Sequence, residues 1–291
     1  MQPQRICIIG VGLIGGSFAL GLRKAGYSGE IVGAGRGVEN LEKAVALGVV
    51  NRYETDLSKA VEGAGLVFLA VPMGAMRQVL ATIRPALDSD AIITDAGSVK
   101  GSFVADAEAV LDDLSRVVPG HPIAGTENSG VQAAFATLYE NRKVILTPLP
   151  QTASGAVDCV RSLWQMTGAE VECLTPAHHD RVLAATSHLP HVLAFSLVDT
   201  LATLQESEEV FRYAASGFHD FTRIASSDPV MWRDICLSNR LALLEMLDRL
   251  SGDLAAMREL IDAGDAGAIE SIFRRAKQAR DEHVQWGRKH S

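Results

Sequence analysis

A glycine-rich turn near the amino terminus constrains the fold of this chain more than any other stretch. Residues 5–9, RICII, form a β-branched, apolar run that is typical of a strand buried on both faces. Gly10, Gly12 and Gly15 follow with the spacing G-x-G-x-x-G, and a helical pattern then begins. This spacing permits a tight turn, close approach of a pyrophosphate to the backbone, and close packing of the helix on the strand. The motif therefore predicts a dinucleotide site, although by itself it is a weak signal.

Two other interpretations of the same stretch remain open at this point. A basic residue before an apolar run also begins a secretory signal, but glycines interrupt the run here and no A-x-A-like cleavage site precedes Arg23 and Lys24. The glycines could also form a tight strand–helix turn that binds no ligand. The pattern of the following residues favours the dinucleotide site.

Strands and helices alternate through the first part of the chain, which predicts a Rossmann-type, doubly wound parallel sheet. Beyond Pro176 the β pattern stops and long helical patterns take over. We expect a dinucleotide-binding domain at residues 1–175 and an all-helical substrate and dimerisation domain at residues 176–291. The expected strands are 5–9, 30–34, 66–72, 91–95, 117–118, 143–147 and 170–174, and the main expected helices beyond 176 are 182–185, 192–204, 231–250 and 253–262.

Composition describes an ordinary globular protein and excludes several classes of partner. The formal net charge of -8 argues against nucleic acid, because nucleic-acid binders concentrate Lys and Arg. No uninterrupted apolar stretch is long enough to span a bilayer, so we expect no membrane partner. The four cysteines are scattered and lack C-x-x-C spacing, which indicates buried thiols in a reducing, cytoplasmic compartment. The apolar run Leu237, Leu241, Leu244 and Leu247 favours a homodimer packed through the C-terminal helices.

The end of the second expected strand bears on the choice of cofactor. NAD-preferring sites usually carry an acidic residue there for the ribose 2′-OH, whereas this chain has Gly35, Arg36 and Gly37. Arg36 can pair a 2′-phosphate and stack on adenine, so we expect NADP to be preferred over NAD. A solvated turn arginine is the alternative. The expected cofactor-binding residues are Gly10, Gly12, Leu13, Ile14, Gly15, Arg36, Val71, Pro72 and Ser98.

Ligands of such sheets bind in a crevice at the carboxyl ends of the strands. We expect Val71 and Pro72 to line this crevice and Ser98 to lie near the nicotinamide. The alternative for Ser98 is an N-cap of the following helix. His121 follows another short strand. A loop histidine there is suited to acid–base work on an alcohol, although it could simply brace the loop.

Two polar segments interrupt the helical half. In the first, SHLPH, His188 and His191 open a long helix with Pro190 in its first turn. A metal site with His178 and His179 is disfavoured, because supporting carboxylates or thiols are absent and adjacent histidines diverge on a helix. In the second segment, Arg223 can bind a carboxylate, Asp220 can tether it, and Asp228 with Pro229 starts a helix.

The motifs GVGLIGGS, DAGSVK, HPIAGTE, SHLPH and FTRIASSDPxMW together resemble the prephenate/arogenate (cyclohexadienyl) dehydrogenase family over nearly the whole chain. The resemblance implies oxidative decarboxylation of a cyclohexadienol in tyrosine biosynthesis, with hydride transfer to NAD(P). It also implies the site residues. His121 and Ser98 are the catalytic candidates, and the substrate-binding candidates are Arg223, His191, Glu127, His188, Thr126, Trp232 and Asp220.

Within this resemblance, His121 would help remove the ring hydroxyl proton, and Ser98 would bridge His121 and the cofactor. Arg223 would pair the departing ring carboxylate, and His191 would contact the substrate side chain. The preference for prephenate or arogenate stays open. The other functions considered are a different β-hydroxyacid-type dehydrogenase and a non-catalytic NADPH-sensing module, and a sensor needs neither His121 nor Arg223.

Overall fold

The computed structural model describes residues 2–126 and 128–289, with side chains through His283. Two compact units are distinguished, Met1–Arg240 and Leu241–Ser291, and each is described by itself. Unit 1 contains both sheets and the helices up to α11, and unit 2 is helical.

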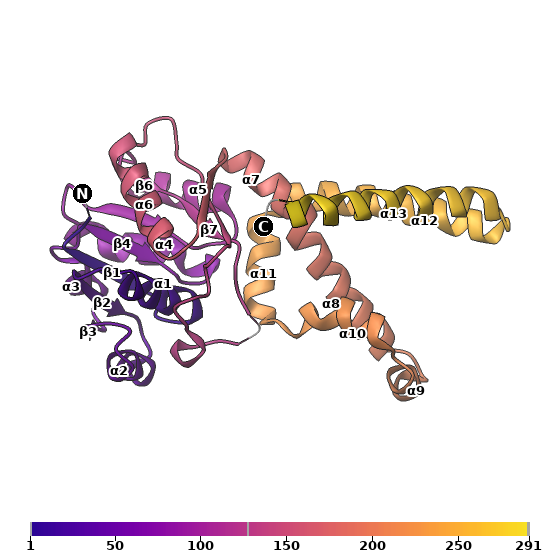
Figure 1. The fold of residues 1–291 in the computed structure, drawn as a ribbon, viewed down its shortest axis with the longest axis horizontal. Coiled ribbons are helices and arrows are strands. Elements are labelled where there is room, and N and C mark those ends of the chain that lie inside the picture. Colours follow the sequence, from indigo (N-terminus) through magenta and orange to yellow (C-terminus); the bar gives the residue numbers. More distant parts are fainter. Residues whose placement is uncertain (1, 127, 290–291) are drawn as a thin grey trace. The chain divides into compact units, whose positions relative to one another are not determined.

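The larger sheet of unit 1 has six parallel strands in the order β3-β2-β1-β4-β5-β6. It is the doubly wound sheet that the alternating pattern predicts, and its order reverses between β1 and β4 (Figure 1). Its strands are β1 Arg5–Ile9, β2 Glu30–Ala34, β3 Arg52–Glu54, β4 Leu66–Leu69, β5 Ile92–Asp95 and β6 Val117–Val118.

Both faces of this sheet are buried. Successive side chains of each strand point to opposite sides of the sheet and enter different clusters. Ile6 and Ile8 of β1 belong to one buried cluster, whereas Cys7 and Ile9 belong to the other. This explains the uninterrupted apolar character of the strand. The helices connecting the strands of this sheet are α1 Leu13–Lys24, α2 Val38–Ala46, α3 Leu57–Val61, α4 Met76–Ile83 and α5 Lys100–Val110. Helix α6 Ser154–Met166, later in the chain, packs against α1 and β6.

A second, three-stranded sheet holds the segment around His121. It consists of β7 Gly120–Pro122, β8 Lys143–Leu146 and β9 Glu170–Cys173, with β7 antiparallel and β9 parallel to β8. His121 is therefore a strand residue that pairs with Ile145, and the expectation of a loop histidine is wrong. Pairing with β8, a strand distant in sequence, overrides the turn-like composition around it.

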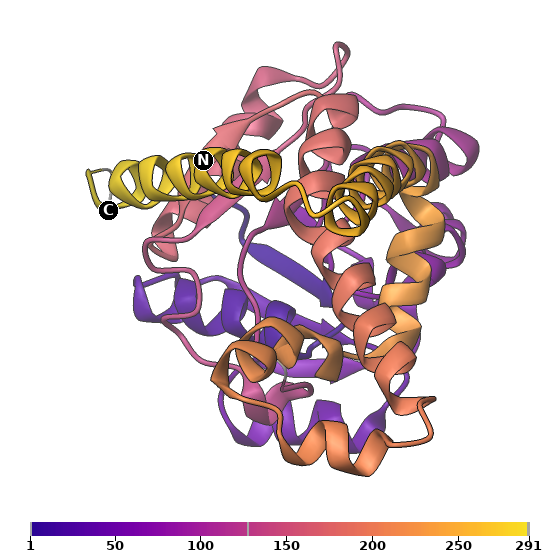
Figure 2. The same cartoon turned by 90° about the vertical axis from the view of Figure 1, so that its right-hand side faces the viewer.

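The helical run after Thr175 is continuous from α7 Pro176–Leu183, through a π-helical turn at Ala184–His188, into α8 Leu189–Ala202 (Figure 2). The expectation that a helix begins at the SHLPH motif is therefore wrong. Pro190 lies inside the run, where its ring would normally clash with the carbonyl four residues earlier. The wider π turn just before it removes that conflict.

By length and composition, one helical run in the described part of the chain, Pro176–Ala202, could cross a membrane, so the expectation that no stretch has this length is not confirmed. However, His179, Asp180 and His188 are buried within it. They hydrogen-bond to α5, to β7 and to Asn239, all within unit 1. Buried polar groups with fixed partners are typical of a core helix.

The remaining helices of unit 1 are α9 Ser207–Arg212, α10 Ser216–Thr222 and α11 Pro229–Ser238. Asp228 caps α11 by accepting a hydrogen bond from the backbone N–H of Met231, at 2.7 Å, so this expectation is confirmed. The single helix expected at 231–250 is wrong, because α11 ends at Ser238 with Asn239 as its C-cap, and α12 begins at Arg240. The side chain of Asn239 is buried and bonds to groups in α7 and the π turn, which fixes the break.

Unit 2 contains most of α12 Arg240–Asp262 and all of α13 Ala266–Lys289. The helix expected at 253–262 is the last part of α12. A turn at Gly264, with a φ of 66°, separates them. Apolar side chains recur along α12 with alternating spacings of three and four residues, the pattern of a helix that packs along one seam. These residues are Leu243, Leu247, Leu250, Leu254, Met257 and Ile261.

All four cysteines are free, but only Cys7 is buried, and Cys173 is exposed. The expectation of four buried thiols is therefore wrong for the other three.

Candidate active site

The glycine turn between β1 and α1 has the geometry of a phosphate cradle. Gly10 has a φ of 99°, and a Cβ there would collide with the carbonyl oxygen of Ala70. A Cβ on Gly15 would collide with the carbonyl of Gly10, so the first and third glycines are required by the fold itself. A Cβ on Gly12 would meet no atom within 4 Å. Gly12 thus borders open space beside the first turn of α1, which fits a pyrophosphate.

Val71 and Pro72 follow the carboxyl end of β4 beside this turn. The strand stops at Leu69, earlier than expected, and Ala70 still donates its N–H to Ile9 at 2.8 Å. A Cβ on Gly10 would lie 3.2 Å from a methyl group of Val71. The expected crevice residues are therefore adjacent to the cradle.

The DAGSVK segment is held by a buried ion pair between Asp95, the last residue of β5, and Lys100, the first of α5. Asp95 also accepts the N–H groups of Gly97, at 2.8 Å, and Gly120, at 3.0 Å. Lys100 donates to the carbonyl of Gly120 at 2.6 Å. Both backbone polar groups of the residue before His121 are therefore fixed by one ion pair.

Ser98 lies in this braced segment and is half-buried. It is not the N-cap of α5, because Val99 occupies that position. The free N–H groups of Lys100 and Gly101 are instead satisfied by Asp180, so the helix does not need a serine cap. The capping interpretation of Ser98 is wrong.

His121 contacts a second histidine. Its Nδ1 lies 2.9 Å from Nε2 of His179, and Nδ1 of His179 lies 2.8 Å from Oδ1 of Asp180. Burial, with the positive charge of Lys100, holds the pKa of His121 well below its usual range. His121 is therefore neutral at pH 7 and can accept a proton.

A second cluster surrounds Trp232 on α11. His191 stacks on this indole, with 3.5 Å between ring centroids, and its Nδ1 donates to the carbonyl of Ser187 at 2.8 Å. Burial lowers the pKa of His191, and the charge of Arg223 lowers it further, against the opposing bond to Ser187. His191 is thus neutral and close enough to Arg223 to sense its charge.

His188 joins the two clusters. Its Nδ1 accepts a hydrogen bond from Nδ2 of Asn239 at 3.0 Å, and the same amide donates to the carbonyl of Asp180 at 2.8 Å. The proton of neutral His188 is therefore on Nε2. This atom and the indole Nε1 of Trp232 are buried and have no hydrogen-bond partner within residues 2–126 and 128–289. Burial lowers the pKa of His188 to about 4. The ring centroids of His188 and Trp232 are 6.1 Å apart, so these two buried N–H donors lie close together. Such a pair is suited to a polar ligand that can accept hydrogen bonds.

Other predicted residues are less firmly connected. Arg223 and Asp220 are both exposed, and no ion pair joins them in the part of the chain that the structure describes, so the expected tether is not observed. Thr126 is exposed and accepts the N–H of Asn128 at 3.2 Å. Glu127 lies outside the described residues.

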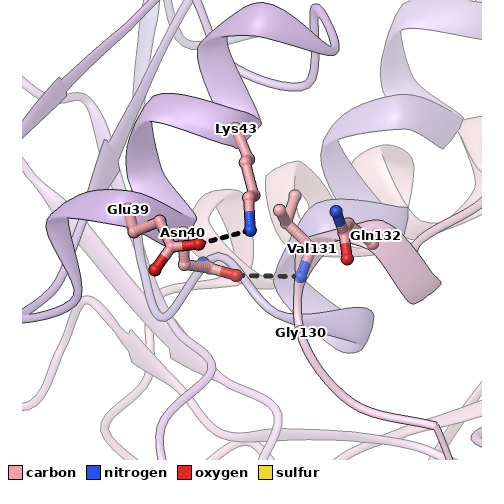
Figure 3. Close-up of a pocket in the computed structure, with 6 residues that line it drawn as sticks. All are labelled: Glu39, Asn40, Lys43, Gly130, Val131 and Gln132. Atoms are coloured by element: carbon pink, nitrogen blue, oxygen red, sulfur yellow. Dashed lines mark hydrogen bonds and ion pairs between the residues drawn. The ribbon is translucent and has the colours of Figure 1, made fainter.

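The adenosine end of the expected cofactor site has no acidic residue in the segment 35–37 after β2. Glu39 is on α2 and pairs with Lys43 at 2.6 Å. Figure 3 shows both beside a cavity of about 180 Å³ that is also lined by Gly130, Val131 and Gln132. Asn40 connects this cavity to the glycine turn, because it donates to the carbonyl of Val11 at 2.7 Å and accepts the N–H of Val131 at 3.0 Å.

Sequence reasoning placed Asp95 in the segment that lines the crevice, but it gave Asp95 no role and missed Lys100, His179, Asp180 and Asn239 as parts of the site. His179 was considered only as a metal ligand, and no cluster of three or more candidate metal ligands occurs among the described residues. Asp95 and Lys100 carry opposite charges five residues apart, next to an apolar strand. This spacing is the sequence signal that could have indicated their ion pair. The partners of His179 and Asn239 are distant in sequence and left no such signal.

A doubly wound sheet with a ligand-ready glycine turn, and a neutral imidazole beside its carboxyl edge, define a dinucleotide-dependent dehydrogenase. Two family models match this chain, the prephenate dehydrogenase nucleotide-binding domain over residues 18–173 and the prephenate dehydrogenase dimerization domain over residues 175–275. The chain belongs to the prephenate dehydrogenase family. It is an NAD(P)-dependent oxidoreductase of the prephenate/cyclohexadienyl dehydrogenase type, in tyrosine biosynthesis.

Individual relatives agree with this assignment. A cyclohexadienyl dehydrogenase from Zymomonas mobilis is 38% identical over 281 residues, 95% of each chain. A prephenate dehydrogenase from Bacillus subtilis is 36% identical over 96% of this chain and 76% of its own length. The crystal structure of prephenate dehydrogenase from Aquifex aeolicus, in complex with hydroxyphenyl propionate and NAD⁺, matches with a TM-score of 0.90 and 40% identity over 97% of this chain and 98% of that chain.

Proposed function

We propose that this enzyme oxidises the ring alcohol of prephenate, arogenate or both, with loss of the ring carboxylate as carbon dioxide, and that His121 is the general base. The observation that carries the proposal is the neutral, half-buried imidazole of His121, held through Nδ1 by His179. Its Nε2 has no hydrogen-bond partner among the described residues and is available to a substrate hydroxyl.

The glycine turn, Leu13 and Ile14 at the start of α1, and Val71, Pro72 and Ser98 hold the cofactor in this proposal. The open space at Gly12 supports their role. The bound dinucleotide supplies the hydride acceptor. Ser98 bridges His121 and the cofactor in this proposal, and the Asp95–Lys100 pair supports it by fixing the neighbouring Gly97 and Gly120.

Arg223 binds the ring carboxylate that departs, and His191, stacked on Trp232, contacts the substrate side chain. The free Nε2 of neutral His191 can accept a hydrogen bond, whereas Nε2 of His188 and Nε1 of Trp232 can donate. Thr126 and Asp220 lie on exposed segments and contribute at the entrance. Aromatisation drives decarboxylation, so these residues chiefly orient the substrate.

We propose NADP as the preferred cofactor. Its support is the absence of an acid at residues 35–37 together with the exposed guanidinium of Arg36, which can pair a 2′-phosphate. The relative from Aquifex aeolicus binds NAD⁺, so the preference rests on this chain's own residues.

We also propose the domain division at residue 175, with residues 1–175 binding the dinucleotide and 176–291 providing substrate contacts and a homodimer interface. The apolar residues that recur along α12 from Leu243 to Ile261, the α12 stripe, support the dimer. Free cysteines, including exposed Cys173, support a cytoplasmic location, which cell fractionation would test.

The experiment that tests the proposal measures absorbance of the reduced nicotinamide, with prephenate or arogenate combined with NAD or NADP. Turnover with NADP far above that with NAD is expected, and Arg36→Ala should reduce this preference by about 10-fold or more. A comparison of the two substrates gives the substrate preference.

Activity with NAD alone would contradict the cofactor proposal and leave the reaction intact. No turnover in any combination, from folded protein that still binds cofactor, would contradict the reaction and favour a sensing module. Turnover of an unrelated β-hydroxyacid would favour the alternative function, a different β-hydroxyacid-type dehydrogenase.

A further inference from the structure

We propose that His179 and Asp180 are positioning residues that hold His121 in one tautomer and share the positive charge it acquires. This inference rests on the proposed role of His121 as the base. The three side chains form one hydrogen-bonded line, His121 to His179 to Asp180, in which Nδ1 of each histidine faces the next residue.

The direction of this line follows from Asp180. Its Oδ1 accepts the N–H of Lys100 and its Oδ2 accepts the N–H of Gly101, both at 2.8 Å, at the N-terminus of α5. These bonds and the one from His179 lower the pKa of Asp180 despite its burial. Asp180 is thus a carboxylate, which can only accept hydrogen bonds. Nδ1 of His179 must therefore carry the proton.

The proton positions of both imidazoles follow from that assignment. In the tautomer that this bond selects, with the proton on Nδ1, His179 has a lone pair on Nε2. The 2.9 Å contact to His121 then requires that Nδ1 of His121 donates. Neutral His121 consequently has a lone pair on Nε2, the atom that has to receive the substrate proton.

The line is rigid because three parts of unit 1 meet at Asp180. Its carboxylate is bound by α5, and its backbone carbonyl accepts Nδ2 of Asn239 from the junction after α11. His179 is 0% exposed, and its backbone N–H bonds to Thr175 at 2.9 Å. A second imidazole so completely buried has no access to solvent or substrate, so it can act only through His121.

The charges around His121 explain why it needs this support. Burial and the charge of Lys100 disfavour a proton on His121, and Asp180, at the other end of the line, carries a negative charge. When the substrate hydroxyl gives its proton to Nε2, His121 becomes a cation that retains its Nδ1 proton. That proton can be shared with Nε2 of His179, which brings positive charge next to the Asp180 carboxylate.

The test replaces His179 with Phe, which preserves a planar buried ring without hydrogen bonds, and with Gln, whose amide oxygen can still accept. Exposed His178, the adjacent residue, provides the matched control as His178→Gln. The first readout is the nitrogen NMR spectrum of the histidine rings in the ¹⁵N-labelled full chain without ligands. His121, assigned by its loss in His121→Asn, should show a protonated Nδ1 and an unprotonated Nε2.

In His179→Phe, His121 should show both tautomers, and kcat should fall by about 10- to 100-fold with KM within about twofold. His179→Gln should recover part of kcat, and His178→Gln should match the wild type. A wild-type His121 with its proton on Nε2 would overturn the proposal, as would unchanged tautomer and kcat in His179→Phe. If His179→Phe does not fold, the wild-type spectrum and His179→Gln still decide.

The NMR readout needs no turnover, so failure of the proposed reaction and failure of the tautomer assignment are distinguishable. A correct tautomer in a chain that oxidises no cyclohexadienol would contradict only the reaction.

Discussion

His121 acquires its properties from buried neighbours on other elements. The buried Asp95–Lys100 pair fixes both backbone groups of Gly120 and thereby the start of β7. Such a pair is costly to bury and adds little stability, so its use here is to hold a geometry. At this scale, the reactivity of one imidazole depends on charges placed by other elements.

Replacing His121 with Asn removes the proposed base but keeps a polar side chain. We expect kcat to fall by roughly 10²- to 10⁴-fold, with substrate affinity nearly intact, because the residue acts mainly in proton transfer. Steady-state kinetics and a substrate-binding titration measure the two effects. An equal loss of affinity would assign His121 to binding instead.

The dependence of kcat/KM on pH in the wild-type enzyme should also report on His121. Because the pKa of His121 is lowered, the imidazole stays unprotonated as pH falls through 6.5 and is protonated only at more acidic pH. The acidic limb of kcat/KM should therefore lie below 6.5, and it should be absent from His121→Asn. An acidic limb above 6.5 would contradict the lowered pKa.

At the scale of elements, the three glycines of the β1–α1 turn have separable roles. Gly10 and Gly15 are needed because their added Cβ atoms would collide with backbone carbonyls, whereas Gly12 faces empty space. The motif therefore encodes both a turn and a ligand surface.

Gly12→Ala and Gly10→Ala form a matched pair that separates these roles. Gly12→Ala should leave the Tm nearly unchanged and weaken dinucleotide binding by about 10-fold or more, because the methyl group occupies the phosphate approach. Gly10→Ala should destabilise the fold by at least about 1 kcal/mol, since its φ of 99° is strained for alanine. Thermal unfolding and dinucleotide titration measure both. Unaltered binding in Gly12→Ala would place the phosphates elsewhere.

At the scale of the whole molecule, the α12 stripe is too apolar for a solvated helix surface. Leu254 is 58% exposed and Ile261 is 64% exposed within one chain, although they follow the heptad-like spacing of a packing seam. A second copy of the chain is the occupant that the dimerization-domain match supports.

Sedimentation velocity of the full chain should therefore give about twice the monomer mass of 31.1 kDa. The double substitution Leu254→Gln and Ile261→Gln should shift the equilibrium toward monomer, because it removes apolar area from the seam. Arg258→Gln on the same helix is the matched control and should not. A wild-type monomer at micromolar concentration would contradict the proposed dimer.

The sequence by itself determined the class of fold and the location of the dinucleotide turn. Both are local signals: β1 is apolar on both faces because helices cover the sheet on both sides, and the spacing of Gly10, Gly12 and Gly15 is a backbone requirement. The helix start at Asp228 and Pro229 was predictable for the same reason. Motif resemblance then added the family, and the comparisons confirm it.

Only the tertiary structure decided what His121 contacts. Its strand pairs with β8, its ring meets His179 at a separation of 58 residues, and Asn239 breaks the helix expected at 231–250 in order to reach Asp180. Propensity and periodicity act over a few residues, whereas these bonds depend on how α5, α7 and α11 pack. The tautomer of the proposed base is therefore a property of the packed molecule, and no segment of the sequence contains it alone.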